Sequence, residues 1–353
     1  MKNLLLFLSF LLPFGGFAQL DTTAIDQFLQ THIDQRHFEG TVLVADQGKV
    51  AYQRTHGLAD RKLQLPIQDD SQFAIASITK MLTAVVVLQL VDEDKLELNQ
   101  SLQELLPEID FPNGENITIH HLLLHISGLP TEPLSVYDAN RSNEAVVRYN
   151  LEKGKVYGQY NKFYYNNMDY MILGLVIQAV TGKDWQTNIH ERIITPLGLK
   201  NTGFLKLGER PTQLVNSYAV SRKGKFEKNE SFHVENMYAA GNMYSNAHDL
   251  LIIDQAMYSD QLLSEAAKAK LQLSYPEYGY TGYSVWTYTY QFTESRPRIM
   301  ERRGALGGFN VVLIRFLDRN QTLIILSNND GFNPDSWGDE QNLREGLIMA
   351  IAR

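Results

Sequence analysis

The order of predicted strands and helices constrains the fold of this 353-residue chain more than any other feature. Residues 41–45 and 49–55 read as a hairpin, and strand-like segments return at 283–290, 310–316 and 322–327. Between these segments the apolar spacing is mostly helical. The pattern predicts an α/β (α+β) fold, in which both termini build one antiparallel sheet with flanking helices and an inserted, mostly helical lobe.

The N-terminal residues have the composition of a secretory signal peptide. Lys2 precedes an apolar run at 4–12, and Gly16-Phe17-Ala18 fits a small-x-small cleavage site. The run is short for a bilayer span, although an uncleaved anchor stays open as an alternative. We therefore expect residues 1–18 to be removed, no stable membrane span afterwards, and a periplasmic or secreted protein. The expected catalytic domain covers 21–335, with a sheet lobe from about 21–72 and 275–353 and a helical lobe at about 77–273.

Composition excludes several classes of function. The chain has no cysteine, which rules out disulfides, thiolate metal sites and a cysteine nucleophile. Its formal net charge is −8 and it has no Lys/Arg cluster, which argues against nucleic acid as a partner. His121 and His125 have zinc-protease spacing, but position 122 is Leu where a catalytic Glu would stand. We expect packing or polar contacts for these histidines, and neither a metal nor an organic cofactor.

Ser77 and Lys80 stand at the start of an apolar predicted helix. Residues three apart share a helix face, so the Lys80 ammonium can reach the Ser77 hydroxyl. Free N–H groups and the positive end of the helix dipole suit a nucleophile that generates an oxyanion. Burial would disfavour the charged form of Lys80 and make it a proton acceptor. The spacing also fits an N-cap serine beside a surface lysine, so the spacing alone is weak evidence for a catalytic pair.

A phenol and a carboxamide two residues apart could face the same cleft, the first to carry a proton and the second to orient a lysine or a substrate amide. This spacing alone does not choose among candidates, and an ordinary polar N-cap explains it equally well. Three pairs have the spacing: Tyr164/Asn166, Tyr165/Asn167 and Tyr244/Asn246.

Two cations and a glycine precede the predicted strand at 310–316. Arg302 or Arg303 could bind a substrate carboxylate, and Gly304 would allow a ligand to approach the backbone closely. The N–H near Ala305 could be an oxyanion donor. The alternative is a charged edge strand with a glycine bulge.

Together these motifs resemble the serine β-lactamase and penicillin-binding-protein superfamily. The most similar branch contains class C β-lactamases, D-alanyl-D-alanine carboxypeptidases and related esterases. Segments at 73–80, 117–130 and 241–250 also resemble family segments, and the likeness runs from about Asp21 to about Asn329. It implies the β-lactamase/transpeptidase-like fold, and it implies the Tyr165/Asn167 register because the next segment follows at family spacing.

One departure from the family pattern concerns its Lys/His-Thr/Ser-Gly triplet, which stands here as Arg302-Arg303-Gly304. The first cation is kept, but the hydroxyl that helps to hold a ligand carboxylate in β-lactamases is lost. The resemblance therefore implies a serine hydrolase while putting efficient β-lactamase action in doubt.

The sequence thus predicts an exported serine hydrolase that forms a Ser77 acyl-enzyme with a D-alanyl-type peptide or an ester. A peptide derived from peptidoglycan is one such substrate. The alternatives are a true β-lactamase and a catalytically silent protein that binds cell-wall peptide. The predicted catalytic residues are Ser77, Lys80 and Tyr165; the predicted substrate and oxyanion residues are Asn167, Arg302, Arg303, Gly304 and Ala305.

Overall fold

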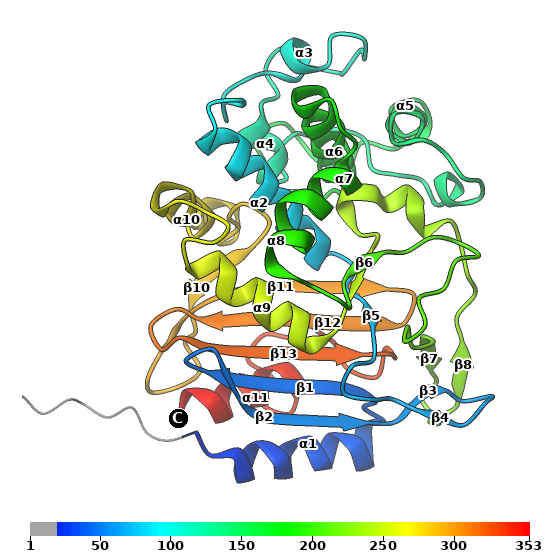
Figure 1. Ribbon diagram of the computed structural model, residues 1–353, viewed down its shortest axis with the longest axis vertical. Helices are drawn as coiled ribbons and strands as arrows, with labels where there is room; N and C mark the ends of the chain where they lie inside the picture. The colour runs from blue at the N-terminus through cyan, green and yellow to red at the C-terminus, as the bar shows by residue number, and fades with distance from the viewer. Residues whose placement is uncertain (1–19) are drawn as a thin grey trace, which may run out of the picture.

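A six-stranded antiparallel sheet forms the lower half of the molecule in Figure 1. The computed structural model describes residues 20–353, so the predicted signal peptide and its cleavage site lie outside the described residues. The first strands of the chain pair with the last, which confirms the predicted sheet built from both termini. In spatial order its strands are β10 (Trp286–Thr289), β11 (Arg298–Leu306), β12 (Phe309–Phe316), β13 (Gln321–Ser327), β1 (Gly40–Asp46) and β2 (Lys49–His56).

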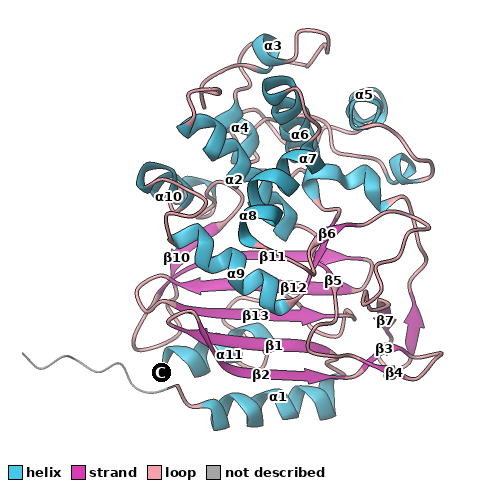
Figure 2. Ribbon diagram, viewed as in Figure 1, coloured by secondary structure: helices cyan, strands magenta, loops and turns pink. Residues whose placement is uncertain are grey.

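The helices gather mainly above one edge of this sheet (Figure 2). Short strands connect the two parts: β3 (Leu58–Asp60) with β4 (Leu65–Pro66), β5 (Phe73–Ala74) with β9 (Met243–Ser245) and β6 (Gly203–Phe204), and β7 (Tyr218–Val220) with β8 (Phe226–Lys228). The helices are α1 (Thr22–Arg36), α2 (Ile78–Asp92), α3 (Leu102–Leu105), α4 (Ile119–Leu123), η1 (Leu134–Tyr137), α5 (Asn143–Lys153), α6 (Asn167–Thr181), α7 (Trp185–Ile189), η2 (His190–Ile194), α8 (Thr195–Leu197), η3 (Val234–Ala240), α9 (Ala247–Tyr258), α10 (Glu265–Leu271), η4 (Pro276–Tyr278) and α11 (Leu343–Ala352).

The inner strands of the sheet are buried on both faces, and their alternating side chains enter two different cores. Leu43 and Ile324 pack with α2 and the helical lobe. Their neighbours Val42 and Ile325 pack with α1 and α11 on the opposite face. The strands between these layers are therefore apolar in succession rather than in alternation, as the sequence of 322–327 shows.

The helix that carries Ser77 runs through the centre of the upper part. Nearly every side chain of α2 is buried, because α6, α7, α10 and η3 pack against it and strands β11 and β12 of the sheet also contact it. A helix that is apolar on all sides is typical of a buried core element. Its N-terminus points toward the boundary between sheet and helices, and this position sets the location of the site.

Strand β11 was predicted only as the alternative, a charged edge strand, and in the structure it is an inner strand. The sequence placed Arg302 to Gly304 before a strand, whereas they lie inside β11, which is paired with β10 on one side and β12 on the other. Charged residues lower the strand propensity of this segment, and their buried partners come from distant parts of the chain. The predicted strand at 283–290 is shorter in the structure, where β10 covers Trp286–Thr289.

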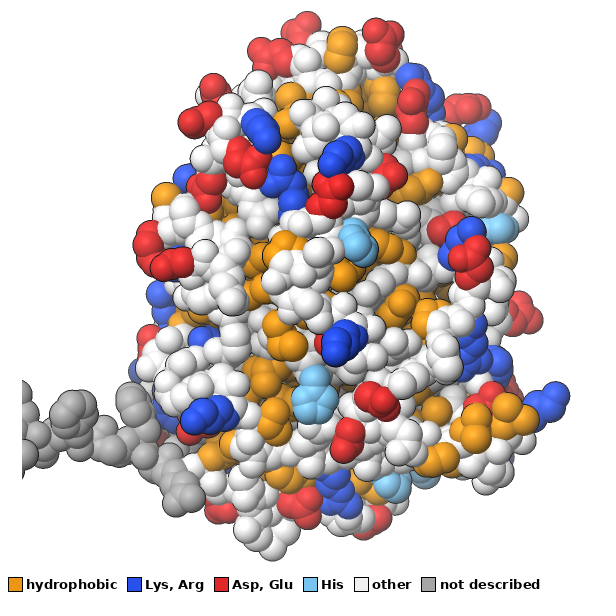
Figure 3. All heavy atoms as spheres, viewed as in Figure 1, with side chains coloured by type: hydrophobic (Ala, Val, Ile, Leu, Met, Phe, Trp, Pro, Cys, Tyr) orange, Lys and Arg blue, Asp and Glu red, His pale blue; other side chains and the backbone are white. Residues whose placement is uncertain are grey.

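Acidic and basic side chains are intermingled over the face of the molecule seen in Figure 3. Several form exposed ion pairs, among them Lys183 with Glu191 at 2.7 Å. Such pairs contribute at most about 1 kcal/mol each to stability. Within the described range 20–353, none of the helices combines the length and the apolar character that crossing a bilayer demands.

Candidate active site

Ser77 lies at a sharp turn from strand to helix. Strand β5 pairs with β9 and ends at Ala74, and α2 begins at Ile78. Between them Ala76 has φ 46°, a left-handed conformation that residues with a side chain rarely adopt. Surrounding structure must hold such a residue in place, and strain of this kind clusters at functional sites. The turn leaves Ser77 half-buried at the N-terminus of α2.

Lys80 is completely buried one turn further along the helix. Its Nζ donates to Ser77 Oγ at 3.2 Å, to Asn167 Oδ1 at 2.6 Å and to the Ala240 carbonyl at 2.6 Å. No carboxylate of residues 20–353 lies within ion-pair distance of it. Burial, aided by the positive charge of Arg302 and opposed by Tyr165, lowers the pKa of Lys80 below its ordinary value. The Lys80 ammonium therefore releases its proton more readily than an exposed lysine does, and the amine that it leaves can accept a proton.

Tyr165 comes from the loop that enters α6. Its Oη lies 2.7 Å from Ser77 Oγ and accepts a hydrogen bond of 2.7 Å from Arg302 Nη2. Burial alone would raise the pKa of the phenol, but Arg302 and Lys80 outweigh burial and lower it. The two neighbouring cations thus shift the phenol toward its deprotonated form beside the serine hydroxyl.

The two competing tyrosine–asparagine pairs lie elsewhere. Tyr164 is 40% exposed and stacks on Tyr157, while Asn166 caps α6 by accepting from the Met168 N–H. Tyr244 lies in β9, where its ring packs against Gly203. Of the three pairs, the structure brings Tyr165 and Asn167 to Ser77 and Lys80.

Arg302 reaches the site from the middle of β11. Its guanidinium donates from Nε to the Ser77 carbonyl and from Nη1 to the Ser284 carbonyl, each at 2.8 Å, besides its bond to Tyr165. The side chain is buried, and its acceptors are two backbone carbonyls and a phenol, with no carboxylate among them. Such a planar, fixed donor holds the phenol and the start of α2 in one arrangement.

Gly304 allows β11 to pass directly against the turn before Ser77. A Cβ at this position would lie 2.7 Å from the Ile75 carbonyl oxygen and 3.0 Å from the Ala76 Cβ, so no larger residue fits without movement. The next residue, Ala305, is exposed. The end of β11 and the N-terminus of α2 are therefore adjacent strips of backbone on one side of the site.

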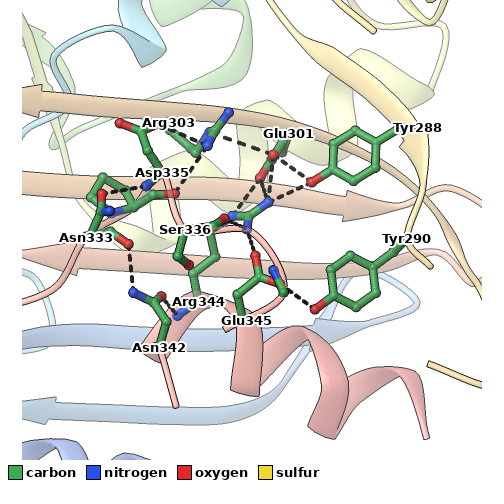
Figure 4. A network of polar contacts seen from close by, with 12 residues as sticks. Tyr288, Tyr290, Glu301, Arg303, Asn333, Asp335, Ser336, Asn342, Arg344 and Glu345 are labelled. Carbon is green, nitrogen blue, oxygen red and sulfur yellow. Dashed lines mark hydrogen bonds and ion pairs between the residues drawn. The ribbon is translucent and has the colours of Figure 1, made fainter. Parts of the chain in front are cut away.

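Arg303 lies on the opposite face of the sheet, because successive strand residues alternate. Figure 4 shows its guanidinium beside Asp335, with a contact of 3.0 Å between Nη1 and Oδ1. On the same face Glu301 contacts Arg344 of α11 at 2.7 Å. The structure therefore brings Ser77, Lys80, Tyr165, Asn167, Arg302 and Gly304 together, and it separates Arg303 from them.

Sequence analysis did not identify His125 and Asp169 as neighbours of the site. The His125 ring centroid lies 4.5 Å from that of Tyr165, and its Nδ1 is 3.1 Å from Asp169 Oδ2. Burial lowers the pKa of His125 and raises that of Asp169, so both groups favour their neutral forms. Ser127 donates to the other oxygen of Asp169 at 2.5 Å. This buried cluster supports the back of the Tyr165 ring, consistent with the polar contacts expected for His125.

Glu132 was not predicted from the sequence to lie near the site. Its Oε1 accepts a hydrogen bond from Asn167 Nδ2, although the two residues are 35 positions apart in sequence. No local spacing connects them, so only the fold reveals the contact.

Comparison with known proteins identifies the family. The model of the family described as Beta-lactamase matches residues 25–347. A penicillin-binding protein of Bacillus subtilis is 26% identical over 328 residues, covering 87% of this chain and 71% of the relative. The teichoic acid D-alanine hydrolase of Staphylococcus aureus is 29% identical over 228 residues, covering 64% of this chain and 55% of that protein.

Solved structures share the fold. The octameric penicillin-binding protein homologue from Pyrococcus abyssi has a TM-score of 0.78 at 22% identity, covering 93% of this chain and 77% of that one. The D-amino acid amidase from Ochrobactrum anthropi, solved with L-phenylalanine amide, has a TM-score of 0.78 at 20% identity, covering 94% and 96%. The chain therefore belongs to the β-lactamase family, and it is a serine hydrolase with the fold of that family.

Proposed function

We propose that this protein is an exported hydrolase that forms an acyl-enzyme on Ser77 with a D-alanyl-type peptide or an ester. The observation that carries the proposal is the position of Ser77 Oγ, 2.7 Å from Tyr165 Oη and 3.2 Å from Lys80 Nζ. Both partners have lowered pKa values, so each releases its own proton more readily and can then exchange a proton with the serine. Export rests on the predicted signal peptide.

In the proposed reaction Ser77 Oγ attacks the substrate carbonyl carbon while its proton passes to the Tyr165–Lys80 pair. The new C–O bond pushes electrons onto the carbonyl oxygen. When the carbonyl re-forms, the bond to the leaving group breaks, and the leaving group takes the proton held by the pair. Water, losing a proton to the same pair, then attacks the ester on Ser77 and releases the acid and the free serine.

The developing oxyanion needs fixed donors. We assign this role to the backbone N–H groups of Ser77 and Ala305, because Gly304 lets β11 lie against the turn before the serine. The buried charges of Lys80 and Arg302 lie beside this position without a carboxylate partner among the described residues. A site with unbalanced positive charge stabilises negative charge as it forms.

The relatives support the choice of substrate. One is named for hydrolysing D-alanine from teichoic acid, and a structural neighbour for its action on D-amino acid amides. On β11, the residue after Arg302 is Arg303, which faces away and offers no hydroxyl beside Ser77. This arrangement favours a D-alanyl or ester substrate over a β-lactam.

Labelling with a fluorophosphonate probe tests the nucleophile. We expect the natural protein to be labelled and Ser77→Ala to lose the label. Ser264→Ala is the matched control, because Ser264 also caps a helix but is exposed at the start of α10. Retained labelling of Ser77→Ala would discard the assignment. Rapid turnover of a chromogenic cephalosporin would favour the β-lactamase alternative, and inertness to all these compounds would favour the silent binding protein.

A further inference from the structure

His125 holds the turn that carries Tyr165 and Asn167 at two points. The residue follows α4 and is almost completely buried. Its carbonyl oxygen accepts a hydrogen bond of 2.9 Å from the Tyr164 N–H, and its ring Nδ1 accepts one of 3.2 Å from the Asn166 N–H. The two neighbours of Tyr165 in sequence are therefore bonded to a single histidine, which fixes the backbone on both sides of the phenol.

The partners of the His125 ring indicate where the protons lie. A ring nitrogen of histidine either carries a hydrogen or offers a lone pair, but not both. Because the Asn166 N–H donates to Nδ1, this nitrogen offers its lone pair. Asp169 Oδ2 lies 3.1 Å from the same Nδ1, and an ionised carboxylate has only acceptor atoms. The contact is therefore a hydrogen bond when the hydrogen lies on Asp169, which is the pattern of a neutral imidazole beside a protonated carboxyl group.

Ser127 completes this pattern. Its hydroxyl oxygen accepts from the Leu129 N–H at 3.1 Å, and its hydrogen is donated to Asp169 Oδ1 at 2.5 Å. A protonated carboxyl group offers one O–H donor and one carbonyl acceptor. Here the donor meets His125 Nδ1 and the acceptor meets Ser127, so both oxygens of the buried carboxyl group have partners.

Burial and the surrounding charges act in the same direction on this pair. Burial, followed by the positive charges of Arg302 on β11 and Lys80 on α2, lowers the pKa of His125. Burial raises the pKa of Asp169, with Glu132 acting in the same sense, while the hydrogen bond from the serine and the charge of Lys80 oppose it. The electrostatics of the surroundings therefore agree with the count of donors and acceptors.

A neutral pair also suits the position beside the phenol. The imidazole faces the rings of Tyr165 and Tyr170, with centroids 4.5 and 5.1 Å from its own. An imidazolium there would be a further cation beside Tyr165, and an ionised Asp169 would raise the pKa of Lys80 by its negative charge. With both groups neutral, the pair fixes the phenol without changing the proton affinity of the groups that activate Ser77.

We infer that His125 is a positioning residue for Tyr165, and that a protonated Asp169 holds its imidazole in the neutral form with the hydrogen on Nε2. The inference rests on the proposed chemistry of Ser77, because the phenol must lie within hydrogen-bond reach of that hydroxyl. Asp169 acts through His125, and His125 acts through the turn that carries Tyr165.

The test measures the rate at which a fluorophosphonate labels Ser77 as a function of pH, which requires no knowledge of the natural substrate. Asp169→Asn keeps a donor for Nδ1 and an acceptor for Ser127 and removes no charge, so the acid limb of the rate profile should stay in place. Glu132→Gln is the control, because the negative charge of Glu132 raises the pKa of Lys80. Loss of that charge should lower the pKa and move the acid limb to lower pH.

Asp169→Leu removes both hydrogen bonds and leaves a side chain of similar size. Labelling of Ser77 should become about 100-fold slower, the loss expected when a reacting group is misplaced by about 1 Å. The final extent of labelling should stay the same. A role in stability alone would instead lower the final extent and leave the rate of the folded fraction unchanged.

NMR of isotopically labelled histidine reads the proton positions in the natural protein. At the pH at which Ser77 is labelled, His125 should show an unprotonated Nδ1 and a protonated Nε2. The variant His125→Gln identifies these signals by their loss. This measurement requires no substitution at Asp169, so it decides the protonation state even if Asp169→Leu does not fold.

Three results would overturn the inference. They are two protonated ring nitrogens on His125, a shift of the acid limb in Asp169→Asn as large as that in Glu132→Gln, and an unchanged labelling rate in Asp169→Leu. If any of them appears while Ser77→Ala is unlabelled, the positioning pair fails and the proposed nucleophile stands. If Ser77→Ala retains the label, the proposed nucleophile itself fails.

Discussion

The two faces of β11 carry buried charge in opposite ways. On one face Arg302 and Lys80 donate to the neutral acceptors around Ser77. On the other, Glu301 is paired with Arg344 of α11, as Figure 4 shows. Two neighbouring residues of one strand thus belong to different clusters. Arg302 belongs to a cluster whose positive charge has no carboxylate partner, and Glu301 belongs to a cluster in which the charges are paired.

This difference determines what each cluster can do. Burial alone would raise the pKa of Glu301, but Arg344 and Arg303 outweigh it and lower the pKa, so the carboxylate stays ionised. Lys80 has no such partner, and its pKa falls. A compensated charge is fixed in one protonation state and holds structure together, whereas an uncompensated one can exchange a proton during a reaction.

The largest expected effect comes from Lys80→Met. Removing the proton acceptor should reduce kcat/KM by about 10²- to 10⁴-fold, the range for general acid–base catalysis. The free energy of unfolding should change by less than about 2 kcal/mol, because relief of a buried amine offsets the loss of a donor to Asn167 and Ala240. Ester hydrolysis and urea denaturation measure the two quantities. Near-natural activity in Lys80→Met would remove Lys80 from the mechanism.

Arg344→Met should have the complementary effect. It leaves Glu301 and Glu345 buried without their cation, which typically costs about 3–5 kcal/mol of stability. Urea denaturation of the purified variant measures the loss. Lys183→Met is the control, since Lys183 and its partner Glu191 are both about half exposed and that pair should contribute about 1 kcal/mol or less. Equal losses of stability in the two variants would contradict this prediction, because they would show that burial of an ion pair does not set how much the pair contributes.

The architecture was predictable because it rests on local patterns. Runs such as 322–327 have enough apolar residues to be recognised as buried strands, and their places at the two ends of the chain predicted their pairing. The proximity of Ser77 and Lys80 was predictable for the same reason, since three residues along a helix return to one face. The 3.2 Å contact follows from helix geometry alone.

What could not be predicted depends on contacts between distant segments. β11 contains three charged residues in succession at 301–303, and only their partners from α11 and α2 make it an inner strand. The left-handed φ of Ala76 has no signal, because glycine would be expected at such a position. Glu132 reaches the site through folding of the 125–132 segment over α6, which no spacing rule describes.

The smallest of the expected effects separates the two arginines of β11. Arg302→Gln removes the positive charge that lowers the pKa of Tyr165 and contributes to lowering that of Lys80. Both pKa values should rise, so the acid limb of the pH profile of kcat/KM should move to higher pH. At neutral pH we expect a loss of about 100-fold, comparable to removal of one oxyanion donor.

Arg303→Gln is the neighbouring control for this profile. Arg303 lies on the far face against Asp335, so its replacement should leave the acid limb where it is. If both variants moved the limb equally, the protonation of the Tyr165–Lys80 pair would depend on the summed charge of β11 rather than on the direct contact of Arg302 with the phenol. A shift confined to Arg302→Gln would instead show that the face of the strand, and the 2.7 Å hydrogen bond on it, sets the pH at which the serine can be activated.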